Sequence, residues 1–213
     1  AGDHTRIPCG SYARLFTMWL VTQIIHSKKQ LIETNESLHA ILKSLALKTD
    51  GDTRRRFKDQ AIRLLTCSMS MFRNQPTPYP ICADFDFQWN HRLPDNPALG
   101  IFKSSFLISN PFFDHVMDAA FPVKRDAVAA MRRSPFCLDI YPWLSHRMSY
   151  NRDDTRISFD ALQPQFGCRF KRPIDFRRNF RRNFTTVCRH YPEARTSFYS
   201  GCIILHPSLT AVP

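Results

Sequence analysis

The sequence predicts an α+β, mainly helical protein built from two tandem winged-helix domains, each a helix-turn-helix followed by a β-hairpin. Two observations carry this prediction. The chain has 213 residues, enough for two small domains, and one order of helical and extended segments occurs twice along it. The expected organisation is an irregular leader over 1–10, a first domain over 11–90, a linker over 91–98, a second domain over 99–206 and a tail over 207–213.

The first predicted domain opens with a helix in which apolar residues recur at helical spacing between Leu15 and Ile25. Thr34 and Thr53 each precede a periodic segment and are expected to cap a helix. Residues 83–89 alternate apolar and polar side chains, the period of a half-exposed strand. The expected elements are helices over 11–27, 34–45 and 54–65, an extended piece over 31–33, and strands over 67–72 and 83–89.

The second predicted domain contains the clearest helix start in the chain, at Ser134-Pro135, where Ser is the N-cap and Pro the first helical residue. Ser158 is expected to cap a later helix that ends at Gly167. The expected elements are a strand over 102–108, helices after Asn110-Pro111 and over 123–133, 134–150, 158–166 and 175–191, an extended piece at 156–157, and a hairpin over 195–205.

Charge composition points to a polyanionic partner. Thirty Lys and Arg against 18 Asp and Glu give a net charge of +12. The most apolar stretch, Leu15 to Ile25, is too short to span a bilayer and lacks a signal-peptide layout. Seven Cys show no CxxC spacing, which favours reduced thiols over a disulfide scaffold. We therefore expect a soluble cytoplasmic protein with no membrane partner.

The last helix of each predicted domain is the candidate for contact with double-stranded DNA, since it corresponds to the third helix of a winged helix, which enters the major groove. On the helix over 175–191, Phe176, Phe180, Phe184 and Val187 share one face and form the predicted core stripe. The predicted DNA-binding residues point elsewhere, because Arg can bind phosphates or guanine and Asn can bind adenine. They are Arg177, Arg178, Arg181, Arg182, Asn179 and Asn183, with Lys171 and Arg172 just upstream.

The helix over 54–65 is expected to make a second contact, dominated by phosphates, through Arg54, Arg55 and Lys58. A basic helix face often contacts only solvent. The prediction of a DNA contact therefore depends on the position of this helix in the predicted winged helix.

Enzyme activity is not expected. The chain has no GxxxxGK[ST] loop for nucleotide phosphates and no HxH pattern for a DNA-nicking metal site. Asp84-x-Asp86 falls on the exposed side of a predicted strand, and Cys188-x-His190 and Cys202-x₃-His206 lack zinc-site spacing. We therefore expect no catalytic residue, no metal and no cofactor.

The chain resembles the plasmid-encoded RepA family of replication initiators in its central and C-terminal motifs. The residues that carry the resemblance are Arg132-Arg133-Ser134-Pro135, Leu138-Asp139-Ile140-Tyr141, Trp143-Leu144, Arg147-Met148-Ser149-Tyr150, Thr155-Arg156-Ile157-Ser158, Ala161-Leu162-Gln163, Gln165-Phe166-Gly167, Asp175-Phe176-Arg177-Arg178-Asn179-Phe180 and Tyr191-Pro192-Glu193-Ala194-Arg195. Weaker similarity covers Gly10-Ser11-Tyr12 and the segment from Arg56 to Ser68.

This resemblance implies a non-enzymatic bacterial initiator that binds repeated sequences at a plasmid origin, helps to open the duplex and recruits host replication proteins. It also implies tandem winged helices and additional chain before Gly10-Ser11-Tyr12. For the first domain it leaves homodimerisation open as an alternative to the second DNA contact. Two alternatives stay open because a fold does not fix a function. One is a winged-helix transcriptional repressor, and the other is a protein-interaction module with a basic face.

Overall fold

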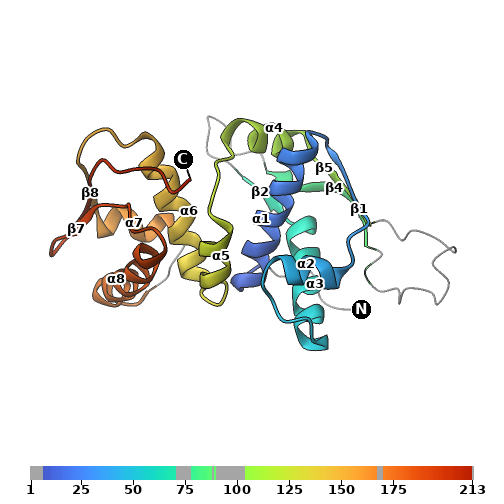
Figure 1. Cartoon of the computed structure of the whole chain (residues 1–213), viewed down its shortest axis with the longest axis horizontal. Helices are drawn as coiled ribbons and strands as arrows, with labels where there is room; N and C mark the ends of the chain where they lie inside the picture. The colour runs from blue at the N-terminus through green and yellow to red at the C-terminus, as the bar shows by residue number, and fades with distance from the viewer. Residues whose placement is uncertain (1–6, 71–77, 88, 90–103, 167–169, 213) are drawn as a thin grey trace, which may run out of the picture. The chain divides into compact units, whose positions relative to one another are not determined.

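A computed structural model describes residues 7–70, 78–87, 89, 104–166 and 170–212 of the chain (Figure 1). These residues form a mainly helical α+β protein that divides into two compact units, residues 1–120 and residues 121–213. Each unit is described by itself. None of the helices within the described residues is long and apolar enough to cross a bilayer.

Within its described residues, the first unit contains four helices and two small sheets. The elements in chain order are α1 (Gly10–Ser27), β1 (Leu31–Thr34), α2 (Leu38–Ser44), α3 (Gly51–Thr66), β2 (Ser68–Met69), β3 (Tyr79–Pro80), β4 (Cys82–Asp86), β5 (Ser104–Ile108) and α4 (Asn110–Ala119). Strands β2 and β3 form a short antiparallel pair. The other three strands form an antiparallel sheet in the order β1-β5-β4, with Ile32 opposite Phe106 and Phe85 opposite Phe106 on the other side.

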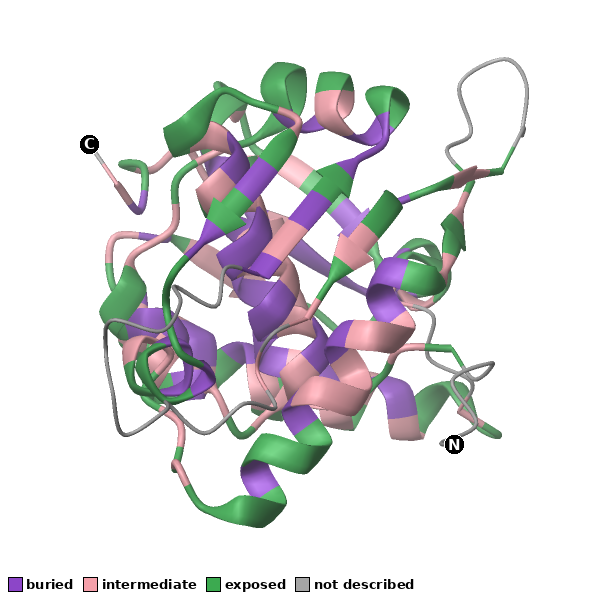
Figure 2. Cartoon of the chain, turned by 90° about the vertical axis from the view of Figure 1, so that its right-hand side faces the viewer, coloured by how far each residue is buried: buried purple, intermediate pink, exposed green. Residues whose placement is uncertain are grey.

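Aromatic rings fill the core of the first unit between the helices and the sheet. Phe16 on α1, Phe57 on α3 and Phe106 on β5 are each 0% exposed. The Phe16 ring meets the Phe57 ring edge-on at 5.8 Å and the Phe106 ring at 6.3 Å. This packing places α1 beside α3, as Figure 1 shows. On β5, buried residues alternate with more exposed ones (Figure 2).

The elements of the second unit share with the first the order long helix, strand, helix, helix, strand pair, although a short helix precedes it here and the first unit also contains β2, β3 and α4. They are α5 (Arg125–Met131), α6 (Pro135–Tyr150), β6 (Thr155–Ser158), α7 (Phe159–Gln165), α8 (Pro173–His190), β7 (Thr196–Phe198) and β8 (Cys202–Leu205). The sheet order is β6-β8-β7, antiparallel throughout. In each three-stranded sheet, the strand that follows the first long helix (β1 or β6) pairs with the last strand of the sheet in chain order (β5 or β8). Counted along the chain, the strands of each sheet therefore lie in the order first, third, second.

Helix starts in the second unit lie where the sequence predicts them. The Ser134 hydroxyl accepts a hydrogen bond from the Cys137 N–H, and Pro135 is the first residue of α6. The Ser158 hydroxyl likewise accepts from the Ala161 N–H at the start of α7. Gly167, the predicted end of that helix, lies outside the described residues.

The helix caps predicted in the first unit are wrong. Thr34 is the last residue of β1, and Ser37 caps α2 by accepting from the Ala40 N–H. Thr53 lies inside α3, which Asp50 caps through a 2.8 Å bond from the Thr53 N–H. In each case another Ser or Asp that can serve as an N-cap lies three residues away, and the side chain that reaches a free N–H takes the role.

The boundary between the units also differs from the prediction. The predicted linker 91–98 falls between β4 and β5 and lies outside the described residues. The sequence places the strand over 102–108 in the second domain, but β5 pairs with both β1 and β4 in the first. Helix α4 packs on the same core through Phe112 and Val116, so the first unit continues to Ala120.

Candidate nucleic-acid interface

Helix α8 has one aromatic face and one basic face. The predicted stripe of Phe176, Phe180, Phe184 and Val187 is buried, with every side chain at most 1% exposed. The side that is exposed to solvent is called here the outer face of α8, and it consists of Ile174, Arg178, Arg181, Arg182, Thr185 and Arg189. Burial of the stripe fixes the rotation of the helix about its axis, so the backbone positions of the outer face lie on the solvent side.

An acidic side chain orients two arginines at the start of α8. The Asp175 carboxylate accepts two hydrogen bonds from Arg172, at 2.9 and 3.1 Å, and one from Arg178 at 3.3 Å. The hydrogen bonds from Arg172 hold the pKa of Asp175 below its ordinary value. The Arg178 side chain is still 82% exposed. Asp175 therefore limits the directions in which Arg178 points without covering it.

Arg177 and Arg181 turn from the basic face toward α7 and the hairpin. The Arg177 guanidinium lies 5.8 Å from the centre of the Phe159 ring and 3.5 Å from the Asp160 carboxylate. The Arg181 guanidinium lies over the rings of Phe159 and Phe198 and donates a hydrogen bond to the Tyr199 carbonyl oxygen. These two arginines already have partners inside the protein.

The predicted pair of adenine-reading residues points toward the protein interior. The Asn183 amide donates to the carbonyl and side-chain oxygens of Asn179. The Asn183 side-chain oxygen accepts from the Ser134 hydroxyl at 3.2 Å and from the Cys137 thiol at 3.3 Å, so it ties α8 to the start of α6. Asn183 serves to dock the helix in this structure.

Arg182 belongs to the predicted set, and its side chain is exposed and forms no hydrogen bond or ion pair with any described residue. Lys171 is exposed ahead of the helix in the same way. The sequence analysis missed Ile174, whose side chain is 61% exposed in the first turn of α8. Its position outside the four-residue Phe spacing is the signal that could have placed it on the outer face.

Acidic neighbours balance part of the basic charge on α3 in the first unit. Arg55 and Arg56 both pair with Asp52, at 2.7 and 2.8 Å, and Arg63 pairs with Asp59. Of the predicted contact residues, Arg54 and Arg55 are exposed, and Arg54 lies 3.3 Å from the ring of His39. Lys58 is half-buried, and this burial lowers its pKa.

Net charge is distributed unequally between the two units. Residues 1–120 contain 14 Lys and Arg against 11 Asp and Glu, a net charge of +3, whereas residues 121–213 contain 16 against 7, a net charge of +9. Most of the excess of +12 therefore belongs to the unit that contains α8. Attraction of a polyanion follows this local excess, so the second unit has the stronger field.

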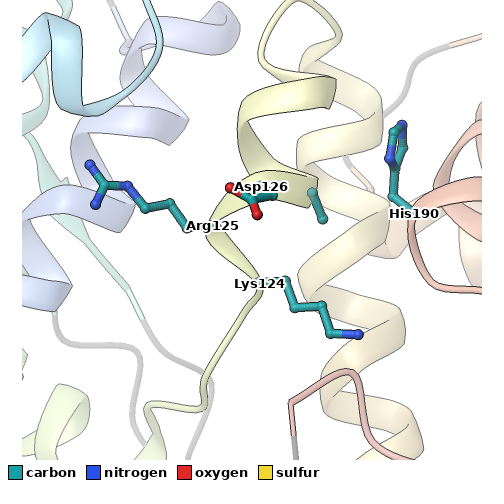
Figure 3. A pocket seen from close by; sticks show the side chains of 5 residues that line it. Lys124, Arg125, Asp126 and His190 are labelled. Atoms are coloured by element: carbon teal, nitrogen blue, oxygen red, sulfur yellow. The ribbon is translucent and has the colours of Figure 1, made fainter.

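A shallow hollow lies beside the start of α5, lined by Lys124, Arg125, Asp126, Ala127 and His190 (Figure 3). Lys124 donates to the Glu193 carboxylate at 3.3 Å, and Figure 3 shows Arg125 pointing away from His190. Across the described residues, no three His, Cys, Asp or Glu side chains are grouped to hold a metal ion.

Two comparisons define what the chain is similar to. Its fold is similar to that in the crystal structure of RctB domains 2-3, with a TM-score of 0.53 and 14% sequence identity over 93% of this chain and 82% of that one. The chain matches no curated protein. The family described as plasmid encoded RepA protein matches residues 7–161, more than half of the chain. The chain belongs to this family of replication initiators, and α8 lies beyond the matched residues.

Proposed function

We propose that the chain is a plasmid replication initiator that binds double-stranded DNA at its origin, and that each unit is a winged helix. The observation that carries this proposal is the two-faced helix α8, with a buried Phe stripe behind exposed arginines. In a winged helix the third helix enters the major groove, and in this proposal α6, α7 and α8 are the three helices of the second winged helix, with α8 directly before the β7–β8 strand pair. The strand order first, third, second in both units supports the same interpretation.

The outer face of α8 supplies the chemistry for this contact. Arg178 and Arg182 present guanidinium groups that can bind the O6 and N7 atoms of guanine or two phosphate oxygens. Lys171 and Arg172 lie before the helix, where phosphates flank a major-groove helix. Ile174 adds an apolar contact for the methyl group of thymine. We expect α8 to specify the sequence and the residues before it to fix the register.

The first unit has fewer features that favour DNA binding than the second. Its net charge is +3, and Asp52 and Asp59 already pair with three of the arginines on α3. Exposed ion pairs contribute little to stability and can exchange for phosphates, so Arg54 and Arg55 stay available for a backbone contact. Homodimerisation through this unit agrees equally with its charge. The recruitment of host replication proteins and the opening of the duplex would follow origin binding.

Binding of the purified chain to the origin of its own plasmid, measured against random duplex across a salt series, tests this proposal. The expected result is tight, origin-selective binding with a steep salt slope, because several phosphates lose their counterions. Equal affinity for both duplexes would leave only a generic basic surface. Failure to bind either duplex would favour a protein partner for the basic face.

A replication assay separates an initiator from a repressor with the same fold. The intact chain is expected to support replication of a plasmid that carries only its origin, and the Arg178→Ala/Arg182→Ala double variant is expected to fail. A chain that binds the same DNA but does not support replication would be a repressor.

A further inference from the structure

We infer that Arg181 is a positioning residue that ties the turn of the β7–β8 hairpin to α8. This inference rests on the proposed function, in which α8 is the DNA-contacting helix of a winged helix and the β7–β8 hairpin is its wing. Among the arginines of the outer face of α8, Arg181 alone is shown bound to the hairpin. Its charge is therefore used inside the protein, and the direct contacts fall to Arg178 and Arg182.

Three elements meet at the Arg181 guanidinium. It lies 5.4 Å from the centre of the Phe159 ring at the start of α7 and 5.3 Å from that of Phe198 at the end of β7. These two rings are parallel within 2° and their centres are 6.4 Å apart. A guanidinium at these distances from an aromatic ring is attracted by the ring's negative face. Arg181 thus joins α8 to α7 and to the hairpin.

The hydrogen bond from Arg181 ends on the hairpin turn itself. Its acceptor is the carbonyl oxygen of Tyr199, and the Tyr199 N–H in turn donates to the Cys202 carbonyl oxygen at 2.9 Å across the turn. The Gly201 carbonyl, two residues further along the turn, accepts from the Phe159 N–H at 3.1 Å. The turn is therefore fixed from one side by α7 and from the other by Arg181.

Core packing below the turn leaves Arg181 as its link to α8. Phe198 packs edge-on against Phe184 at 5.2 Å, which anchors the strand end but does not reach residues 199–201. The Tyr199 side chain is 54% exposed, and Ser200 and Gly201 are exposed too. None of these three turn residues carries a formal charge. Loss of Arg181 should therefore free the turn while the strands below it remain packed.

Hydrogen exchange of the free protein tests this role without DNA. Arg181→Ala is expected to accelerate exchange of the Tyr199 amide roughly tenfold, because a hydrogen bond to a charged group and two ring contacts are lost. Arg182→Ala is the matched control, since it removes one charge from the next residue and has no contact with the hairpin. Arg181→Lys keeps the charge but not the planar fork, so the turn is expected to stay partly loosened.

Two exchange results would overturn the inference. One is a Tyr199 amide that stays as protected in Arg181→Ala as in the native chain. The other is equal acceleration by Arg181→Ala and Arg182→Ala, which would show a general effect of charge on the helix.

Binding to origin duplex gives a second readout. Arg181→Ala is expected to lower affinity by a similar factor at every salt concentration, because the loosened turn is uncharged. Arg182→Ala is expected to reduce the salt slope by about one. A salt slope reduced by one in Arg181→Ala, together with a native hydrogen-exchange rate at the Tyr199 amide, would make Arg181 a direct phosphate contact. This result would refute the inference and leave the proposed function intact. A native chain without DNA selectivity would refute the proposed function, and the exchange data would still decide the role of Arg181.

Discussion

Replacement of Phe180 by Ala should destabilise the second unit more than the loss of any exposed side chain. Phe180 is 0% exposed at the centre of the buried stripe of α8. Six aromatic rings lie within 6.4 Å of its ring centre, those of Phe136, Trp143, Phe159, Phe166, Phe176 and Phe184. Because these rings come from three helices, the cavity left by Ala cannot close without moving α8.

The expected cost follows from this burial. Phe→Ala in a core typically lowers the free energy of unfolding by about 3–5 kcal/mol, the sum of lost transfer energy and the cavity. For a unit the size of residues 121–213, each kcal/mol shifts the melting temperature by roughly 4–8 °C, so the midpoint should fall by more than about 12 °C.

Calorimetry of the full chain measures this shift, and hydrogen exchange at α8 and α1 amides assigns each transition to its unit. Tyr199→Ala, which removes an exposed ring from the same unit, should change stability by no more than about 0.5 kcal/mol. A cost below about 1 kcal/mol for Phe180→Ala would mean that the Phe stripe is not the buried face. The outer face of α8 would then be misassigned.

Three further predictions concern helix caps, pH and thiols. Ser134→Ala should cost about 0.5–2 kcal/mol in urea unfolding, because α6 loses its N-cap. Hydrogen bonds from Arg172 lower the pKa of Asp175, so the stability they contribute is present above the ordinary carboxyl value of 3.8 and is lost as pH falls below it. Asp175→Asn should therefore lower the urea midpoint near neutral pH and match the native chain in strong acid. Burial raises the pKa of Cys82 to about 11, so peptide mapping after iodoacetamide treatment at pH 8 should show exposed Cys9 modified well before Cys82.

Local patterns predicted the helices well because their signals lie within one or two turns. Ser134-Pro135 predicts the N-cap and the first residue of α6, and both are confirmed in the structure. The Phe stripe of α8 fixes a helical face by spacing alone, and the structure buries all of its residues. Periodicity and capping depend on residues that are close together along the chain, so a single sequence contains the information needed to predict them.

Long-range pairing was not accessible in the same way. β5 follows a long segment after β4 yet pairs with β1, more than 70 residues earlier, and no local feature of Ser104–Ile108 specifies that partner. The roles of Asn183 and Arg181 were missed for a related reason. Both were assigned from residue type and helix position, whereas their partners, Ser134 and the Tyr199 carbonyl, come from other elements.

The salt dependence of binding to origin duplex, compared between the native chain and the Arg178→Ala/Arg182→Ala double variant, tests the central claim most directly. If the outer face of α8 binds the origin, the double variant should lose selectivity over random duplex, and its salt slope should fall by about one for each arginine that contacts phosphate. An unchanged slope together with unchanged selectivity would contradict the account, and the DNA contact would then belong to another surface of the chain.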